Sequence, residues 1–359
     1  MGKSDLTLIE CNSSLEVIHA HLLRAAHQHD PGDWVIAYPA WVAERLVRPA
    51  MWTKVLAVSD TRPEYGNVCH KIRENLRRLE QDISFTSYRR IDLLVSDLSW
   101  LMNNVLVARL SRLCSRHGIA FSASILEEGS VLYSGSRLGL RRSLRSWAKY
   151  LFLRVNGFPA LLITPRNVDY FHPLCQKIFC LHPQFLVPPS RVSMERIDTQ
   201  LLESVYDGQL VTLQLNSPSC LYLSQPLYKL VGVKRQLSVV RSFKRRLEQE
   251  GFSHFFYKPH HADLSSWCAL LETECGFKAL GFREMVPVEF LAARCNADII
   301  LSHSTSALLN LRAYGYQGRV ISYGLQELDG SFREQSQFED YCRALRQVGN
   351  VELLDADLI

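Results

Sequence analysis

Short apolar runs alternate with amphipathic stretches along the first part of the chain. The apolar runs have the length and composition of buried strands. They are LTLIE from Leu6, WVIAYPA from Trp34, KVLAVSD from Lys54, IDLLVSD from Ile91 and IAFSASILEEG from Ile119. The stretches between them have helical periodicity; they are SSLEVIHAHLLRAAHQH, CHKIRENLRRLEQD and WLMNNVLVARLSRLCSRHG. This alternation predicts a parallel, doubly wound α/β sheet.

The same alternation returns after an irregular, proline-rich region that runs from Pro159 to Arg196. The expected strands are QLVTLQL near Leu210, CLYLSQPL from Cys220, SHFFYKPH from Ser253, ADIILSHS from Ala297 and GRVISYG from Gly318. Helical patterns cover 235–250, 263–275, 287–296 and 305–315. Two consecutive α/β halves predict two Rossmann-like domains facing across a cleft, with ligands at the carboxyl ends of the strands.

The predicted domain boundaries follow from this pattern. We expect an N-terminal Rossmann-like domain over 1–165, a linker region over 166–205 and a C-terminal Rossmann-like domain over 206–335. The last segment, 336–359, is expected to hold a helix that packs back on the N-terminal domain.

Composition narrows the function classes. The 359 residues are 47% hydrophobic and 21% charged, with a net charge of +5. This balance is that of a soluble globular protein, and it permits an anionic ligand without indicating nucleic acid. No segment approaches the ~20 apolar residues of a membrane span, and the N-terminus has no secretory pattern. The ten cysteines form no CxxC pair, so we expect reduced thiols and no zinc site.

Two adjacent carboxylates and a glycine end the strand expected at 119–127. Glu127 and Glu128 precede Gly129. The structural interpretation is a strand that surfaces into a solvated turn, with the glycine supplying the bend. The functional interpretation makes Glu128 a general base, because a neighbouring carboxylate and partial burial raise the pKa of a glutamate.

A second candidate lies in FFYKPHHAD, residues 255–263. An apolar run ends and presents Lys258, His260 and His261, and Pro259 prevents the strand from continuing. A cation and an imidazole at a strand end suit an anionic leaving group. The structural alternative is that a histidine caps the following helix.

Two further stretches have polar groups at a predicted helix start. Glu289 follows Pro287, and both residues are normal in a first helical turn, so a structural account suffices there. In LSHSTSALLNL, three consecutive hydroxyl residues, Ser304-Thr305-Ser306, open the helical pattern. One hydroxyl satisfies an N-cap, whereas three suit an anion site.

The order of these motifs resembles that of the bacterial sialyltransferases, including the polysialyltransferase-like and lipooligosaccharide families of GT-B architecture. Their D/E-D/E-G motif is similar to Glu127-Glu128-Gly129, and their His-Pro motif to Tyr257-Lys258-Pro259-His260. Their Pro-hydrophobic-Glu element is similar to Pro287-Val288-Glu289, and their Ser/Thr motif to Ser304-Thr305-Ser306. The sequence departs from the pattern where His261 replaces the proline after the histidine.

The resemblance implies a GT-B fold and an inverting, metal-independent transfer of sialic acid from CMP-sialic acid to a cell-surface glycan of capsule or lipooligosaccharide. It implies that Glu128 is the general base and His260 the general acid. The implied donor-binding residues are Lys258, Glu289, Ser304, Thr305 and Ser306. Glu127, Gly129 and His261 are implied as supporting residues, and no cofactor or metal is expected.

A basic amphipathic helix is predicted after the acidic motif. Arg137, Arg141, Arg145 and Lys149 recur at i, i+4 spacing, and Leu140, Leu144, Trp147 and Leu151 share another face. The structural interpretation packs the apolar face on its own domain. The functional interpretation is contact with an anionic glycan acceptor or with lipid headgroups, which corresponds to a cytoplasmic protein at the inner face of the membrane.

Two other hypotheses stay open at this stage. The first is a GT-B transferase with a different donor, such as CMP-Kdo, or a polymer-forming phosphotransferase. The second is a non-catalytic nucleotide- or glycan-binding module in which Glu128 is a turn residue. The acceptor, the linkage, the number of sugars added and the oligomeric state are not encoded in any motif that we identify.

Overall fold

The computed structural model describes residues 3–42, 46–61, 67–129, 132–133, 140–164, 169–260, 262–280, 286–327 and 335–355. Its close contacts divide the chain into two compact units. The first unit comprises Met1–Glu128 and Ser136–Val205, and the second comprises Gly129–Gly135 and Tyr206–Ile359. Each unit is described by itself below.

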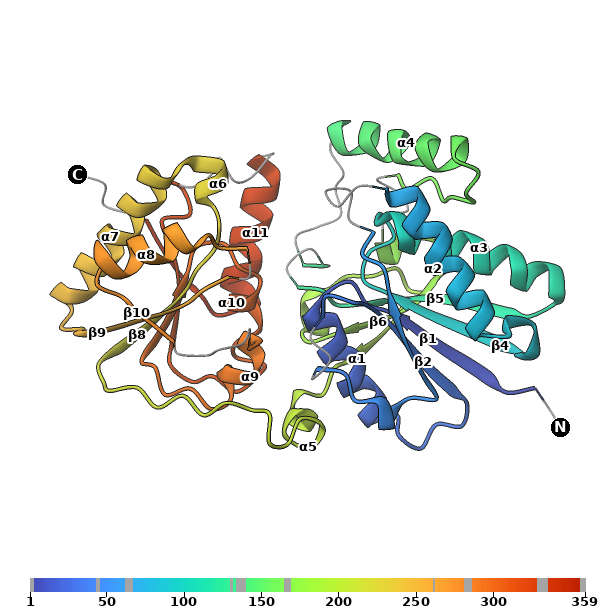
Figure 1. Cartoon of the computed structure of the whole chain (residues 1–359), viewed down its shortest axis with the longest axis horizontal. Helices are drawn as coiled ribbons and strands as arrows, with labels where there is room; N and C mark the ends of the chain where they lie inside the picture. The colour runs from blue at the N-terminus through green and yellow to red at the C-terminus, as the bar shows by residue number, and fades with distance from the viewer. Residues whose placement is uncertain are drawn as a thin grey trace. The chain divides into compact units, whose positions relative to one another are not determined.

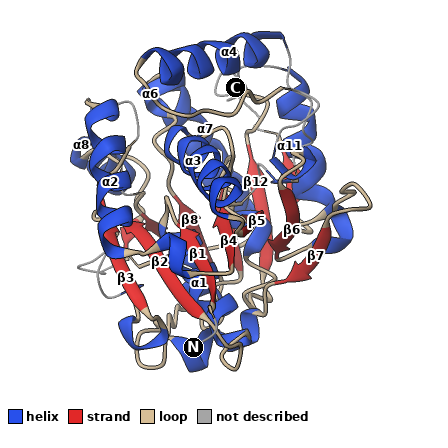
Figure 2. Cartoon of the chain, turned by 90° about the vertical axis from the view of Figure 1, so that its right-hand side faces the viewer, coloured by secondary structure: helices blue, strands red, loops and turns tan. Residues whose placement is uncertain are grey.

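Seven parallel strands form the sheet of the first unit, in the order β3-β2-β1-β4-β5-β6-β7, which Figure 2 shows from left to right. The strands are β1 (Asp5–Glu10), β2 (Asp33–Pro39), β3 (Lys54–Val58), β4 (Arg90–Val95), β5 (Ala120–Leu126), β6 (Cys175–Cys180) and β7 (Ser193–Arg196). The helices are α1 (Ser14–Ala26), α2 (Val68–Asp82), α3 (Leu101–His117), α4 (Leu140–Val155) and α5 (Leu202–Val205). Helix α1 lies on one side of this sheet, and α2 and α3 lie on the other (Figure 1).

Six parallel strands form the sheet of the second unit, in the order β10-β9-β8-β11-β12-β13. They are β8 (Ser219–Leu223), β9 (His254–Lys258), β10 (Lys278–Ala279), β11 (Ile299–Ser302), β12 (Arg319–Tyr323) and β13 (Glu352–Leu354). The helices are α6 (Tyr228–Val231), α7 (Val233–Gln249), α8 (Ser265–Thr273), α9 (Val288–Ala292), α10 (Ala307–Asn310) and α11 (Gln335–Gln347). Helices α7 and α8 cover one side of the sheet, and α9, α10 and α11 cover the other (Figure 1).

Buried aromatic side chains form much of the core between the second sheet and α7. Tyr222 of β8 contacts Phe243 of α7, with ring centroids 5.3 Å apart, and Phe243 contacts Tyr323 of β12 at 5.7 Å. The Ser242 and Tyr323 hydroxyls are hydrogen-bonded at 3.0 Å, so the polar end of the ring is satisfied inside the core. This packing fixes β8 and β12, and it therefore fixes the loops at their carboxyl ends.

The strand orders confirm the predicted fold class, because both sheets are parallel and doubly wound. In the first unit the order reverses between β1 and β4, and in the second it reverses between β8 and β11. Ligands of open α/β sheets bind at such switch points, outside the carboxyl ends of the strands. The residues that follow β1, β8 and β11 are therefore the ones to examine for chemistry.

The predicted linker region over 166–205 is wrong in structural terms, because it contributes two strands to the first sheet. Strand β6 pairs with β5, and β7 pairs with β6. Prolines and short runs hid both strands from a pattern search. Only Ile178, Phe179 and Cys180 of β6 form a continuous buried run, and the four residues of β7 are mostly exposed at the sheet edge.

The structure also bears on two other predictions about the second half. The run QLVTLQL forms no strand; its Leu213 makes a single parallel bridge to Cys295. The C-terminal segment adds to the second unit: it contains α11 and β13, and β13 pairs with β12. A short helix and strand at a chain end can extend the sheet they follow, and their own periodicity does not distinguish that from packing elsewhere.

No helix in the described part of the chain is long and apolar enough to cross a membrane.

Candidate functional site

The two adjacent carboxylates of the acidic motif have different environments. Glu127 is completely buried. Its Oε2 accepts a hydrogen bond from the Leu181 N–H at 2.6 Å, and its carbonyl oxygen accepts one from His19 Nδ1 at 2.8 Å. Glu127 therefore joins the ends of β5 and β6 to α1. Its side chain is therefore held within the first unit by this hydrogen bond.

Glu128 is half-buried at the carboxyl end of β5, and its side chain is hydrogen-bonded to that of Glu16 in the first turn of α1. Glu16 is itself fully buried. Its carboxylate also accepts hydrogen bonds from the Asn12 N–H at 2.8 Å and from the Ser13 hydroxyl at 3.2 Å. The Glu16 N–H donates to the Ser13 hydroxyl, so Ser13 is the N-cap of α1, and the Ser13–Glu16 pair forms a variant of the capping box in which the carboxyl group reaches back to the Asn12 N–H.

Glu10, the last residue of β1, completes this carboxyl cluster. It is buried, and its Oε2 accepts a hydrogen bond from Asn12 Nδ2 at 2.9 Å. Burial, with the nearby charges of Glu128 and Asp60, raises the pKa of Glu10 to about 8. Burial and the charges of Glu128 and Glu10 also hold the pKa of Glu16 well above its usual range. Our sequence interpretation missed both residues, although the S-x-x-E spacing of Ser13 and Glu16 marked the capping box.

In the second unit, Gln225 connects the two strand ends at the switch point. Gln225 follows β8, and its Oε1 accepts hydrogen bonds from the Ser304 N–H at 2.7 Å and from the Ser302 hydroxyl at 3.3 Å. The Ser302 hydroxyl also contacts the Leu223 carbonyl at 2.7 Å. Gln225 was not among the predicted site residues, and no local signal distinguishes it from an ordinary loop glutamine.

The predicted hydroxyl cluster lies at this same edge. Ser304, Thr305 and Ser306 are all partly buried between β11 and α10. The Thr305 hydroxyl accepts a hydrogen bond from the Ala307 N–H at 3.3 Å, so it acts as a local cap. The predicted helix over 305–315 is wrong in length, since α10 has only four residues. So short a helix aligns few peptide dipoles, and the hydroxyls rather than the dipole are the main polar groups here.

Gly129 lies against Ser306 within the second unit. Its φ of +124° is a conformation that only glycine adopts readily. A Cβ at this position would come within 2.8 Å of the Ser306 Cβ and 2.9 Å of its hydroxyl. The glycine of the acidic motif is therefore required both by its backbone conformation and by this close approach.

Lys258 and Glu289 interact electrostatically at the same edge. Lys258 ends β9, and Glu289 is buried in the first turn of α9. Burial lowers the pKa of Lys258, and the charges of Glu289 and Asp263 oppose this shift. Burial raises the pKa of Glu289, and its own backbone N–H and Lys258 oppose that shift. The structure therefore brings together two residues that were predicted separately.

The loop after β9 orients His260. Its Nδ1 accepts a hydrogen bond from the Ala262 N–H at 3.1 Å, and its own N–H donates to Asp263 Oδ2 at 2.9 Å. Because Nδ1 accepts, the neutral imidazole carries its proton on Nε2. His260 is thus prepared as a donor through Nε2. The other histidine of the motif, His261, lies outside the described residues.

His303, inside the LSHSTS stretch, is structural. It is fully buried, its Nδ1 donates to the Tyr323 carbonyl at 2.8 Å, and the Tyr222 hydroxyl contacts its Nε2 at 2.9 Å. Burial lowers its pKa to about 4. The neutral ring joins β8, β11 and β12 just below the hydroxyl cluster.

Of the four basic residues predicted on the helix after the acidic motif, two have side chains that the structure describes, and these two differ in environment. Arg137 and the side chain of Arg141 lie outside the described residues, and Arg145 is exposed. Lys149 points toward its own unit, where its Nζ donates to the Ser99 carbonyl at 2.9 Å. The four residues therefore do not form one exposed basic stripe.

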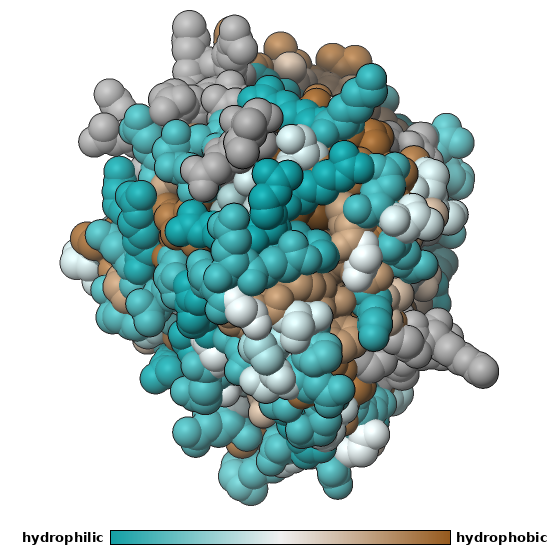
Figure 3. Space-filling model, turned by 90° about the vertical axis from the view of Figure 1, so that its left-hand side faces the viewer, coloured by the Kyte–Doolittle hydropathy of each residue, from teal (hydrophilic) through white to brown (hydrophobic). Residues whose placement is uncertain are grey.

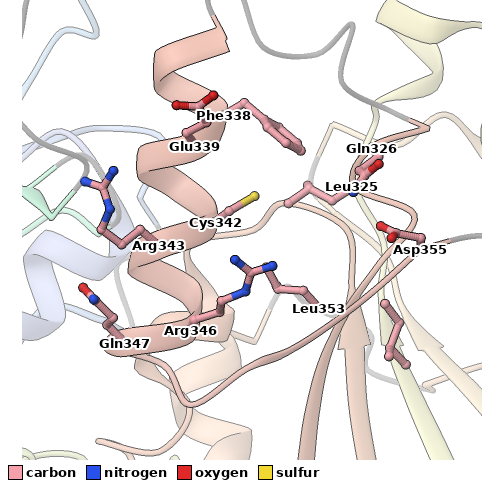
Figure 4. A pocket seen from close by; sticks show the side chains of 11 residues that line it. Leu325, Gln326, Phe338, Glu339, Cys342, Arg343, Arg346, Gln347, Leu353 and Asp355 are labelled. Atoms are coloured by element: carbon pink, nitrogen blue, oxygen red, sulfur yellow. The ribbon is translucent and has the colours of Figure 1, made fainter.

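A cavity of about 480 Å³ opens at the carboxyl ends of β12 and β13, beside α11 (Figure 4). Arg346 and Cys342 of α11 and Asp355 line it. None of the predicted donor-binding residues does. The described residues contain no group of three or more His, Cys, Asp or Glu side chains arranged to hold a metal ion.

The sequence matches no protein-family model, and no curated protein is significantly similar to it in sequence. Solved structures are similar in fold. The α/β-galactoside α-2,3-sialyltransferase of Photobacterium phosphoreum has 9% identity and a TM-score of 0.52, covering 98% of this chain and 99% of its own. The UDP-GlcNAc 2-epimerase of Methanocaldococcus jannaschii has 12% identity and a TM-score of 0.52, covering 96% and 93%. Arabidopsis thaliana UGT89C1, complexed with UDP-L-rhamnose, has 10% identity and a TM-score of 0.52, covering 99% and 86%.

These similarities agree with the two parallel sheets, and together they show a GT-B architecture made of two Rossmann-like units.

Proposed function

We propose that this protein is a glycosyltransferase that uses a nucleotide-sugar donor. The observation that carries the proposal is the set of groups around the switch point of the second unit. Lys258, His260 and the hydroxyls of Ser304–Ser306 supply a cation, an Nε2–H donor and polar hydrogens at the edge where open α/β sheets bind nucleotides. The GT-B neighbours include nucleotide-sugar enzymes, which supports the same function.

The specific reaction that we propose is inverting transfer of sialic acid from CMP-sialic acid to a glycan hydroxyl. Glu128 takes the proton of the acceptor hydroxyl while its oxygen bonds to the anomeric carbon of the sugar. The bond from that carbon to the phosphate oxygen breaks, and CMP leaves with the electron pair. His260 donates a hydrogen bond from Nε2 to the leaving phosphate, and Lys258 and the hydroxyls of Ser304–Ser306 stabilise the charge of that phosphate.

Physical chemistry is consistent with these roles. CMP is a good leaving group, so the protein must chiefly position the reactants and stabilise charge as the bond breaks. A positioned general acid or base contributes about 10²–10⁴-fold. Neutralisation of the phosphate by Lys258, His260 and hydroxyls makes a metal ion unnecessary. We therefore propose that the reaction proceeds with no metal or other cofactor.

The sialyltransferase assignment rests on the order of the motifs along the sequence. The half-buried Glu128 and the Nε2–H tautomer of His260 are consistent with the roles proposed for them. A CMP-Kdo-dependent transferase and a polymer phosphotransferase use similar groups. A non-catalytic nucleotide-binding module requires the second unit but not Glu128.

Release of CMP separates these functions. The purified protein is incubated with CMP-Neu5Ac or CMP-Kdo, with galactosyl or sialylated acceptors, in the presence and absence of EDTA. We expect acceptor-dependent release of CMP from CMP-Neu5Ac, unaffected by EDTA and reduced at least 100-fold in Glu128→Gln and in His260→Ala. Full activity of His260→Ala contradicts its role. Thermal stabilisation by CMP without turnover of any donor favours the binding module.

A further inference from the structure

Helix α4 turns its apolar face away from the unit that carries it. The residues that face the unit are Ser146, Lys149, Tyr150 and Leu153, which pack near Ser99, Leu101, Asn104, Leu161 and Ile163. Of these four, only Leu153 is fully buried and apolar. The helix is thus anchored by the hydrogen bond from Lys149 to Ser99 and by two or three side chains of mixed polarity.

The opposite face of α4 carries four large apolar side chains at i, i+3, i+7 and i+11 spacing. Their exposed fractions are 62% for Leu144, 48% for Trp147, 54% for Leu151 and 85% for Val155. Residues at this spacing lie on one helix face. This is the reverse of the structural interpretation of the sequence, in which the apolar face packs on its own domain.

An ordinary surface helix of this protein is different. Helix α7 buries its apolar residues apart from Val233 in its first turn, and its outer side carries ion pairs such as Lys244–Glu248 and Arg246–Glu250. The side of the molecule that carries α7 is accordingly mainly hydrophilic (Figure 3). The exposed apolar face of α4 is therefore not a general property of these surfaces.

The charges on α4 itself are all positive. The helix sequence contains four arginines and one lysine and no acidic residue. Arg145 and Arg154 are exposed on either side of the apolar face. Arg154 also lines a cavity of about 410 Å³ together with Arg112, Arg116 and His117 from the end of α3, and no carboxylate lines it. An apolar face flanked by cations complements a surface with an apolar interior and anionic headgroups.

We propose that α4 and the end of α3 form a docking surface for an anionic lipid bilayer. Leu144, Trp147, Leu151 and Val155 enter the boundary between headgroups and acyl chains. Arg145, Arg154 and the basic cavity contact the lipid phosphates. The helix lies in the plane of the interface and does not span the membrane. This surface is independent of the proposed transfer chemistry, and its test does not require activity.

Co-sedimentation of the full chain with vesicles tests the proposal. The vesicles contain phosphatidylcholine alone or with about 30% phosphatidylglycerol. The first variant combines Leu144→Ser, Trp147→Ser and Leu151→Ser, and the second combines Arg145→Gln and Arg154→Gln. The matched control is Val187→Ser combined with Leu264→Ser, which removes exposed apolar side chains, 86% and 53% accessible, elsewhere in the chain.

We expect wild type and control to bind anionic vesicles at least ten-fold more tightly than neutral ones. We expect the first variant to lose at least ten-fold of this binding, and the second to lose at least three-fold of its preference for anionic over neutral vesicles. Equal binding of wild type to both vesicles, or unchanged binding of either variant, overturns the proposal. If the first variant does not fold, as judged by circular dichroism, the arginine variant and the dependence of binding on salt still decide it. A wild-type dimer that the first variant dissociates, without vesicle binding, assigns the face to a second copy instead.

Discussion

Glu16 and Glu128 share a hydrogen bond between two carboxyl groups, so the pair must hold a proton. Glu16 is fully buried and its pKa is raised well above its usual range by burial and by the charges of Glu128 and Glu10. Glu16 therefore carries the proton and donates the hydrogen bond, and the Glu128 carboxylate accepts that hydrogen bond. A capping residue of α1 thus positions the carboxylate that we propose as the base.

Replacing Glu16 tests this positioning role. Glu16→Gln keeps a hydrogen-bond donor toward Glu128 but cannot ionise, whereas in the wild type ionisation of Glu16 at high pH removes the donor that positions Glu128. We expect kcat/KM for CMP release in wild type to fall on the alkaline side, and Glu16→Gln to lose that fall. Glu16→Ala should lower kcat about ten-fold and destabilise α1 by about 1 kcal/mol through loss of the capping box. Identical pH profiles for wild type and Glu16→Gln would show that the pair is merely structural.

The buried Glu10 predicts a loss of stability as the pH rises from about 4.5 to 8. Its folded pKa of about 8 exceeds the ordinary value of 4.5, so the folded state holds a proton that the unfolded state releases. This stabilisation is complete below pH 4.5 and is lost as the pH rises through about 8, at up to about 1.4 kcal/mol per pH unit. Urea unfolding at pH 7 and at pH 8 measures it. We expect Glu10→Gln to flatten the decrease, and Glu80→Gln, an exposed partner of Arg109, to leave it unchanged.

Three buried histidines give stability a pH dependence opposite to that of Glu10, because they disfavour folding as the pH falls. Burial lowers the pKa of His19, His21 and His303 to about 4, so only the unfolded state gains their protons as the pH falls from 6.5. Their contribution to the free energy of unfolding should therefore decrease as the pH falls from 6.5 to 4, opposite to the contribution of Glu10 over the same range. Urea unfolding of wild type and His303→Gln at pH 6.5 and pH 5 separates the two, and a pH dependence that this substitution leaves unchanged would contradict the neutral, buried state of the ring.

The proposed role of Glu289 predicts that the protein binds a ribonucleotide more tightly than the matching deoxyribonucleotide. If its buried carboxylate accepts hydrogen bonds from ribose hydroxyls, the protein should bind CMP about ten-fold more tightly than 2′-deoxy-CMP. Glu289→Gln should reduce that ratio towards one, and it should also lower the pKa of Lys258, because it removes an opposing charge. Calorimetric titration with both nucleotides measures the ratio. A variant that binds both nucleotides more weakly but keeps the ratio assigns Glu289 to supporting Lys258 instead.

A negative charge at position 225 should weaken binding of the nucleotide without disturbing the structure. Gln225→Glu retains an oxygen that accepts from the Ser304 N–H and the Ser302 hydroxyl, but it adds a negative charge at the hydroxyl cluster. A charge near a bound phosphate costs about 1 kcal/mol or more, so affinity for CMP should fall about ten-fold. Affinity for cytidine, which has no phosphate, should not change. Equal losses for CMP and cytidine would place the phosphate away from this loop.

The sequence predicted the parts of this protein that depend on local pattern. Buried strands and amphipathic helices show as periods of two and 3.6 residues, and both α/β halves were predicted from them. The strand ends could then be located, and with them Glu128, Lys258, His260 and Ser304. The lengths of α9 and α10 and the strands β6 and β7 were not predicted, because short elements contain too few periods to be recognised.

Tertiary structure alone decided which of these groups meet. Strand order follows from crossover connections and non-local packing, so only the folded sheet places Glu16 beside Glu128 and Gln225 beside Ser304. It also decided that Glu127 is buried and that Glu128 is half-exposed, although the two are chemically identical neighbours. For α4, periodicity showed two faces but not their direction. Lys149 turns inward because its Nζ donates to the Ser99 carbonyl, and the apolar face is left exposed because no other described element of its own unit covers it.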